Sequence, residues 1–261
     1  MPAEFVCEME FDRASAEIEA RYQRCAPHWQ PHLERTRSLI LHAAQLPHRR
    51  RKAVLFGAGL LHDIPLAELA ALYGEVLLVD AVHSRSCRVR AGIFPNVTCV
   101  QADVTGTARH LLLARRTGTP LPRIQPDMFQ NDPDVDLTVS VNLLSQLGCA
   151  PAKLLRTTHS EEEIRAFQRH LIESHLTYLR HSGGHTALVT DFAWSTRVAN
   201  PPTPKTPRYW EVLNGVVLPK PAEVWDWNIA PAPERDPHLD FIAHVAAYPD
   251  WKAANPVAST R

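Results

Sequence analysis

Two stretches of the chain repeat apolar residues every three or four positions, which is the period of an amphipathic helix. The first runs from residue 11 to about residue 48 and contains Pro31, so the pattern predicts two successive helices before the first strand. The second lies behind Ser160 and Glu163, whose S-x-x-E spacing is typical of a capping box. The sequence therefore predicts helices near the N-terminus and a long helix after Ser160.

Continuous apolar runs alternate with shorter helical segments through the middle of the chain. The runs are 53–56, 76–79, 97–100, 137–141 and 186–190. Runs of this kind are typical of strands that are buried on both faces of a parallel sheet. Helices are expected between them at 66–73, 84–91 and 107–116. Strands separated by helices predict parallel pairing in a doubly wound α/β fold, with helices on both faces of the sheet.

The pattern changes after the fifth run. Residues 195–221 begin with a proline-rich stretch that has no periodicity, and we expect them to form an irregular insertion on the surface. Residues 222–230 and 240–248 alternate between apolar and polar, which predicts an antiparallel hairpin near the C-terminus. The expected architecture is a mostly parallel seven-stranded sheet in one domain, 51–261, preceded by an N-terminal helical extension, 1–50.

The charge balance of the chain bears on whether it binds nucleic acid. Lys and Arg together number 28, as do Asp and Glu, so the formal net charge is zero. A balanced chain has no overall positive field to attract nucleic acid, and no nucleic-acid partner is expected. The one basic run, 48–52, is interpreted as a solvated helix end, where cations face the negative pole of the helix dipole.

The cysteines and the N-terminus bear on metal binding, disulfides and cellular location. The five cysteines include no pair at C-x-x-C spacing, so neither a zinc site nor a disulfide framework is predicted, and no metal is expected. The N-terminus lacks the apolar region of a signal peptide, and no run approaches the ~20 apolar residues of a membrane helix. A cytoplasmic protein with no membrane partner is therefore expected.

Residues of types that often bind ligands follow four successive strands. They are Gly57-Ala58-Gly59, Asp80, Asp103 and Asn142. The carboxyl ends of parallel strands meet at one edge of a sheet, and ligands of open α/β sheets bind at that edge. The sequence therefore predicts that these residues surround a single cleft.

Each of these residues has a role with a nucleoside-bearing ligand. Gly57 and Gly59 permit a tight turn and a close approach of the backbone to the ligand. Asp80 is suited to accept hydrogen bonds from both ribose hydroxyls. Asp103 is placed to accept from an adenine amino group, and Asn142 to meet the part of the ligand that is transferred.

The arrangement resembles the class I S-adenosylmethionine (SAM)-dependent methyltransferases over about residues 50 to 193. The segments that carry the resemblance are the motif I-like Val54–Gly59, the motif II acid Asp80, the motif III-like Ala102–Val104, the motif IV-like Asp136–Leu144 and the turn Leu179–His185 before strand five. The late hairpin also suits this fold. The resemblance implies a Rossmann-like SAM-binding domain over 51–261 with the segment 1–50 as its lid. It further implies methyl transfer from SAM to a small-molecule acceptor. The cofactor-binding residues it implies are Gly57, Ala58, Gly59, Asp80, Ala81, Asp103, Val104 and Asn142.

Two positions depart from the family pattern. Leu55 stands where motif I usually carries an acid, and Leu61 stands where it usually has a third glycine. Asp63 is a candidate to replace the missing carboxylate, although it is also suited to cap the helix that follows. The departures leave a non-catalytic binding protein as an alternative. A nicotinamide-dependent oxidoreductase is a further alternative, in which the last glycine of G-x-G-x-x-G would fall at His62.

The catalytic residues and the acceptor stay open. Candidates for a base or an orienting group are His62, His83, Asn142 and Asp191, the last at the end of strand five, and each also has plausible structural uses. The late tryptophans either build an aromatic acceptor pocket or pack the hairpin onto the sheet. They are Trp194, Trp210, Trp225 and Trp227. The accepting atom and the oligomeric state do not follow from the sequence.

Overall fold

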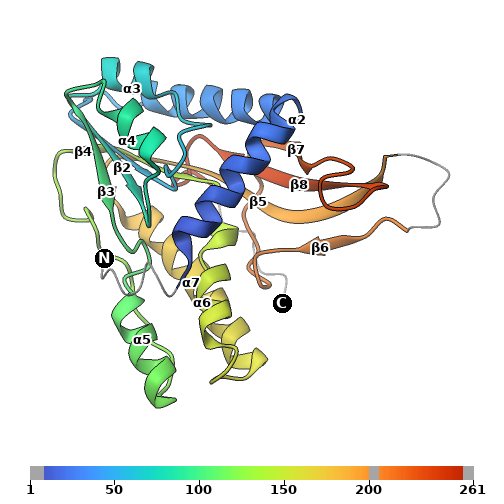
Figure 1. Ribbon diagram of the computed structural model, residues 1–261. Helices are drawn as coiled ribbons and strands as arrows, with labels where there is room; N and C mark the ends of the chain where they lie inside the picture. The colour runs from blue at the N-terminus through green and yellow to red at the C-terminus, as the bar shows by residue number, and fades with distance from the viewer. Residues whose placement is uncertain (1–8, 200–205, 255–261) are drawn as a thin grey trace.

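The computed structural model describes residues 9–199 and 206–254, and within them the chain folds around one sheet (Figure 1). The strands are β1 Lys52–Phe56, β2 Glu75–Asp80, β3 Val97–Gln101, β4 Val135–Val141, β5 His185–Val198, β6 Tyr209–Glu211, β7 Glu223–Ala230 and β8 Leu239–Tyr248. The helices are α2 Phe11–Gln45, α3 Leu66–Leu72, α4 Arg85–Ala91, α5 Ala108–Thr117, the 3₁₀ turn η1 Leu144–Gln146, α6 Cys149–Leu155 and α7 Glu161–His181.

The sheet has the strand order β3-β2-β1-β4-β5-β8-β7, with β6 paired to β5 off this path. Strands β1 to β5 pair in parallel, and β5–β8, β7–β8 and β5–β6 pair antiparallel. This confirms the predicted doubly wound, mostly parallel sheet with its late antiparallel hairpin. The short strand β6 makes eight strands among the described residues instead of the seven predicted.

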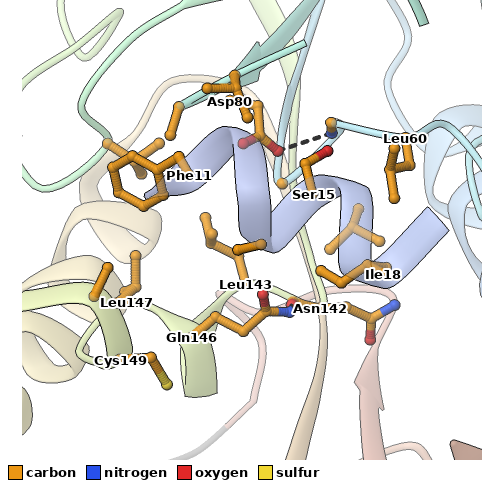
Figure 2. A pocket seen from close by; sticks show the side chains of 18 of the residues that line it. Phe11, Ser15, Ile18, Leu60, Asp80, Asn142, Leu143, Gln146, Leu147 and Cys149 are labelled. Carbon is orange, nitrogen blue, oxygen red and sulfur yellow. Dashed lines mark hydrogen bonds between the residues drawn. The ribbon is translucent and has the colours of Figure 1, made fainter. Parts of the chain in front are cut away.

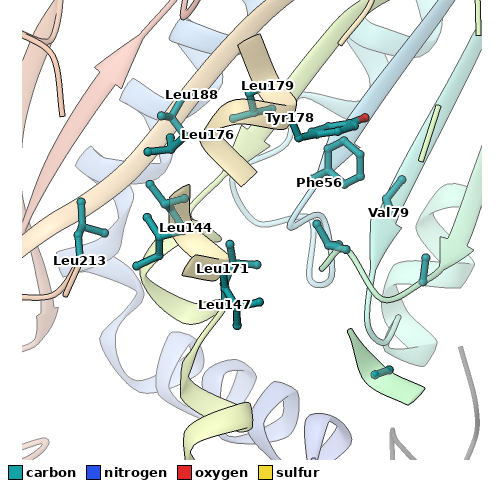
Figure 3. Close-up of a cluster of buried hydrophobic side chains, with 14 of the residues drawn as sticks. Phe56, Val79, Leu144, Leu147, Leu171, Leu176, Tyr178, Leu179, Leu188 and Leu213 are labelled. Atoms are coloured by element: carbon teal, nitrogen blue, oxygen red, sulfur yellow. The ribbon is translucent and has the colours of Figure 1, made fainter. Parts of the chain in front are cut away.

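Alternate residues of the central strands build the two sides of the core. On β1, Val54 and Phe56 belong to the layer packed against α5, α6 and α7 (Figure 3), whereas Ala53 and Leu55 belong to the layer that packs α2, α3 and α4. Both faces of the strand are buried because side chains alternate between faces and helices cover each of them. Leu55 is fully buried, so the position that lacks the family's acid is a core position.

The N-terminal segment forms one helix, α2, and the prediction of two helices was wrong. Pro27 and Pro31 both lie inside it. Proline removes one helical hydrogen bond and crowds the preceding turn, which bends a helix without always ending it, and Figure 1 shows α2 changing direction along its length. Trp29 lies between the two prolines, and its Nε1 donates to the carbonyl of Ile229 on β7 at 3.0 Å, which holds this part of the helix against the sheet.

Strand β5 is longer than predicted. It continues past Asp191 through a bulge to Val198, because β8 supplies backbone partners along that whole length. The predicted irregular insertion, 195–221, therefore contains the end of β5 and all of β6, while its part 200–205 lies outside the described residues.

Helix beginnings were predicted with mixed success. The capping box before α7 is confirmed: the Ser160 hydroxyl accepts from the Glu163 N–H, and the Glu163 carboxylate accepts from the Ser160 N–H at 2.8 Å. Asp63 does not cap α3, because Pro65 occupies the N-cap position and no side chain caps it. The turn η1 and the helix α6 were not predicted. None of the described helices is long and apolar enough to cross a membrane.

Candidate functional site

A cavity of about 590 Å³ lies at the carboxyl ends of β1 to β4. The strand-end residues that line it are Gly57, Gly59, Asp80, Ala81, Asp103, Val104 and Asn142. Ala58 is the exception among the predicted cofactor-binding residues, because its side chain is fully buried and it is not part of the lining. The cavity sits where the strand order reverses between β1 and β4, which is the position at which open α/β sheets bind ligands.

The two glycines of the first turn are required by sterics. Gly57 has a φ of 82°, and a Cβ on it would lie 2.3 Å from the carbonyl oxygen of Val141. A Cβ on Gly59 would lie 2.9 Å from Asp80 Oδ2. This tight turn brings the Gly59 N–H to Asp80 Oδ2 at 2.8 Å, the contact drawn in Figure 2.

Asp80 is a buried carboxylate at the end of β2. Burial raises its pKa, and His83 together with the backbone N–H groups of Gly59, Ala81 and Val82 act in the opposite direction. Hydrogen bonds from these N–H groups favour the charged carboxylate, which can then accept further hydrogen bonds. Asp80 thus presents a fixed acceptor at the wall of the cavity.

Asp103 is engaged in local structure. Its Oδ1 accepts from the Thr105 N–H at 2.9 Å and from the Thr105 hydroxyl at 2.6 Å, while Oδ2 accepts from the Ala108 N–H at 2.7 Å. These bonds hold the turn that begins α5, which is the usual work of an aspartate before a helix. The residue lines the cavity, but both of its oxygens have protein partners.

Asn142 combines backbone strain with a partly buried polar side chain. Its φ is 48°, in the left-handed region that asparagine tolerates better than most residues. Its Nδ2 donates to Asp63 Oδ2 at 2.7 Å, and among the described residues its buried Oδ1 has no hydrogen-bond partner. Burial raises the pKa of Asp63, and the bond from Asn142 acts against that rise. Strain and an unmet acceptor at a strand end are features of functional sites.

His32 of α2 reaches the same place. Trp225 Nε1 donates to His32 Nδ1 at 3.0 Å, and burial lowers the pKa of His32 to about 3. The ring is therefore neutral and carries its proton on Nε2, which lies 3.1 Å from the side-chain amide of Asn142. The Asn142 amide thus lies between His32 of α2 and Asp63.

His62 lines the cavity, and a fixed hydrogen bond orients its ring. Its Nε2 lies 3.0 Å from Glu19 Oε2, and the ring stacks on Tyr22 with centroids 3.8 Å apart. Burial lowers the pKa of His62, although Glu19 acts in the opposite direction. A neutral ring that donates from Nε2 to Glu19 keeps a lone pair on Nδ1, so His62 has the proton arrangement of a general base.

The other two catalytic candidates do not line the cavity. Asp191 Oδ1 accepts from the Ser145 hydroxyl at 2.5 Å, and its Oδ2 accepts from Trp194 Nε1 at 2.6 Å. His83 lies behind the end of β2, with its Nε2 at 3.2 Å from the carbonyl of Val100. Both residues therefore have hydrogen-bond partners that are not part of the cavity lining.

The beginning of α2 covers the cavity. Figure 2 shows Phe11, Ser15 and Ile18 of this helix on the same cavity as Asp80, and all of them line it. Glu10, at the N-cap of α2, accepts from Lys153 Nζ of α6 at 2.7 Å across the cavity mouth. The first turns of α2 therefore lie against the cavity at the strand ends.

Several lining residues were not found from the sequence. Leu143, Leu147 and Cys149 belong to the unpredicted turn η1, its flanks and α6 (Figure 2). Leu144, Leu147 and Leu154 recur at helical spacing, which is the one signal that would have indicated a helix there. The apolar stripe of α2 predicted a helix but did not show which part of it faces a ligand.

The sequence left open whether the late tryptophans build an acceptor pocket or pack the hairpin, and they differ in this respect. Trp225 is buried and bonded to His32, so it packs the hairpin onto α2. Trp227 stacks on His32 with centroids 4.0 Å apart and also lines the cavity. Trp194 and Trp210 face each other at 6.3 Å and are not part of the lining.

Comparison with known proteins shows structural likeness only. No protein-family model matches the chain, and no curated protein sequence matches it. DhpI in its complex with SAH is 13% identical, with 90% of this chain and 95% of that chain covered and a TM-score of 0.36. The N-methyltransferase NodS from Bradyrhizobium japonicum WM9 is 12% identical, covers 83% of this chain and 96% of its own, and has a TM-score of 0.37.

The magnesium protoporphyrin IX methyltransferase ChlM from Synechocystis PCC 6803, with bound SAM, is 13% identical, with 82% of this chain and 79% of that chain covered and a TM-score of 0.33. These three structures are similar to the chain in fold, at low sequence identity.

Proposed function

We propose that this protein binds SAM in the cavity at the ends of β1 to β4 and transfers its methyl group to a small-molecule acceptor. The observation that carries the proposal is the convergence of the Gly57–Gly59 turn, Asp80 and Asn142 on one cavity of about 590 Å³ beneath the lid. That volume lies within the range of about 300–1,000 Å³ that is usual for cofactor and small-molecule sites.

The residues present suit a nucleoside with an amino-acid tail. Asp80 offers an acceptor for the ribose hydroxyls, and the bare backbone at Gly59 leaves room beside it. The apolar groups of Ala102 and Val104 line the same wall and suit the face of a purine ring. Asn142 lines the same cavity at the end of β4 and is placed for the amino-acid end of the ligand.

Bound SAM would supply an activated methyl group on a sulfonium, and the protein's own contribution is alignment and exclusion of water. The lid residues Phe11 and Ile18 close the cavity with apolar surface. His62 offers Nδ1 as an acceptor for a proton that leaves the acceptor molecule during transfer, and Glu19 holds the ring in the tautomer that this requires. The limited volume and mostly apolar lining of the cavity favour a small acceptor over a macromolecule.

The test is calorimetric titration of the purified protein with SAM and with SAH, the product that has lost the methyl group. We expect one site per chain, with an affinity that Asp80→Asn reduces by about ten- to a hundredfold. That range corresponds to the loss of about one hydrogen bond to a charged group. The amide keeps an acceptor for the Gly59 N–H, so the turn itself should persist. Glu162→Gln, which removes an exposed carboxylate from α7, is the matched control and should leave affinity unchanged.

The alternatives give different results in the same experiment. Binding of NADH or NADPH, with no heat from SAM or SAH, would replace the proposal with a nicotinamide-dependent activity. Binding of SAH without turnover of radiolabelled SAM against a panel of small amines, phenols and carboxylates would favour a non-catalytic binding protein. The observation that favours this second function is Leu61, which lines the cavity at the position where the resemblance implies a glycine.

A further inference from the structure

A second cluster of chemically active side chains lies behind the end of β2, outside the cavity lining. It consists of His83, Cys87 and Cys99, whose ligand atoms all lie within 4.8 Å of one another. His83 Nδ1 is 3.6 Å from Cys87 Sγ. We propose that these three residues form a binding site for a thiophilic divalent cation, Zn²⁺ in the first place.

The separations suit tetrahedral coordination. Zn–S bonds of about 2.3 Å and Zn–N bonds of about 2.0–2.1 Å, at tetrahedral angles, place neighbouring ligand atoms about 3.5–3.8 Å apart. The His83–Cys87 distance already falls in that range. The remaining separations are at most 4.8 Å, so the three ligand atoms surround a space of the size that a metal ion needs.

The tautomer of His83 leaves its inner nitrogen ready to coordinate. Its Nε2 lies 3.2 Å from the carbonyl oxygen of Val100, and a carbonyl can only accept, so Nε2 carries the ring proton. Nδ1 then holds a lone pair directed towards Cys87. A histidine whose outer N–H is donated to a backbone carbonyl is the usual arrangement around a protein-bound metal, because that bond fixes the ring orientation.

The surrounding elements hold the ligands in place. Ser84 caps α4 by accepting from the Cys87 N–H at 3.0 Å, which fixes His83 and Cys87 four residues apart on either side of the cap. Cys99 lies in the middle of β3, where its register with Leu78 of β2 is set by the sheet. Because β3 is the edge strand and Cys99 is only half-buried, an ion can enter from solvent.

The coordination would have three protein ligands and one open position for water. Binding releases the two thiol protons to solvent and forms two Zn–S bonds and one Zn–N bond, so the charge of the ion is balanced by two thiolates. This site was not found from the sequence, because Cys87 and Cys99 stand on different elements and have no C-x-x-C spacing. The site does not depend on the proposed methyl transfer, but it would fix the turn that follows Asp80.

The experiment uses the whole protein, stripped with a chelator and kept reduced with a phosphine, and titrates it with Co²⁺ and then with Zn²⁺. We expect one equivalent of Co²⁺ to give thiolate-to-metal charge-transfer absorption together with the visible bands of a tetrahedral ion, and Zn²⁺ to displace it. Cys99→Ser and His83→Gln should each lose the charge-transfer intensity in part and weaken Zn²⁺ binding at least about tenfold.

Cys149→Ser, which removes the exposed cysteine of α6, is the matched control and should bind both ions as the wild type does. Thermal melting and circular dichroism establish that the variants are folded, and Cys99→Ser is chosen because its side chain is only half-buried. The proposal is overturned if wild-type protein gives no thiolate band at one equivalent, or if the band is unchanged in both ligand variants. Formation of a Cys87–Cys99 disulfide in air, with no metal binding under reduction, would likewise overturn it.

Discussion

Leu61 occupies a backbone conformation that glycine would adopt freely. Its φ is 59°, and its side chain is 1% exposed within the layer that packs α2 and α3. A left-handed conformation costs a non-glycine residue about 1–2 kcal/mol, whereas a buried leucine truncated to alanine typically costs about 2–5 kcal/mol. Because burial of the side chain outweighs the backbone strain, the loop is more stable with leucine than with a smaller residue.

Two substitutions at this position separate packing from backbone strain. Leu61→Ala should lower the free energy of unfolding by about 2–5 kcal/mol because it empties the buried space. Leu61→Gly empties the same space but relieves the backbone, so it should be about 1 kcal/mol more stable than Leu61→Ala. Urea unfolding measures both values. At an ordinary helical or extended position glycine would be the less stable of the two, and that order would contradict the left-handed assignment.

The residue scale also shows where sequence reasoning succeeds and where it ends. Gly57, Asp80 and Asn142 were placed at one edge because parallel strands end together, and the structure brings them to one cavity. The role of Asp103 was missed, although its partners Thr105 and Ala108 are close in sequence. An aspartate just before a helix is suited to hold the turn that begins the helix, and that local role was not weighed against ligand binding.

At the scale of elements, local pattern predicted the strands better than the helix ends. Runs of apolar residues buried on both faces are distinctive, and β1, β2 and β4 were found within a residue or two. The continuation of α2 through its prolines and the extension of β5 were missed, because both elements are held by partners far away in sequence. The α2 segment is held by β7, and the end of β5 is held by β8.

Two neighbouring residues of α2 test whether this helix covers the cavity. Ser15 lies on the face of α2 that lines the cavity, whereas Ala16, the next residue, is exposed to solvent. Ser15→Trp should therefore fill part of the cavity and abolish ligand binding, while Ala16→Trp should bind as the wild type does. Calorimetry with SAH measures the affinity, and the melting temperatures should differ little between the two variants. Equal affinity in both variants would show that α2 does not cover the site in solution.

At the scale of the whole molecule, the core contains histidines that stay neutral. Burial lowers the pKa of His175 to about 4 and that of His32 to about 3, from an ordinary value of 6.5. His175 lies between α7 and β4, with Nε2 at 2.9 Å from the Ser140 hydroxyl, and its buried Nδ1 has no partner among the described residues. Protonating either ring inside the folded core would place a charge there without compensation.

The two buried histidines should make the folded protein less stable as the pH falls. Above pH 6.5 both rings are neutral in the folded and the unfolded chain, and the stability they permit is fully present. As the pH falls, the unfolded chain takes up protons first, so the folded state loses stability progressively down to the folded pKa values. Burial raises the pKa values of Asp63, Asp80 and Asp191, which acts in the opposite direction at lower pH. A variant that lacks one of the histidines shows how much of the pH dependence of stability comes from that histidine and not from these carboxyl groups.

The substitution His175→Phe separates the contribution of His175 to the pH dependence from that of the carboxyl groups. It should lower stability at neutral pH, because Ser140 loses its partner. Between about pH 7 and about pH 4.5, however, the wild type should lose about 2–3 kcal/mol more of its free energy of unfolding than the variant does, because only the wild type has this ring to protonate. Urea unfolding at the two pH values measures the difference, and His181→Phe at the exposed end of α7 is the control that should keep the wild-type pH slope. An unchanged slope in His175→Phe would mean that solvent reaches the ring. The core between α7 and the sheet, which Figure 3 shows as a continuous apolar cluster, would then be open to water.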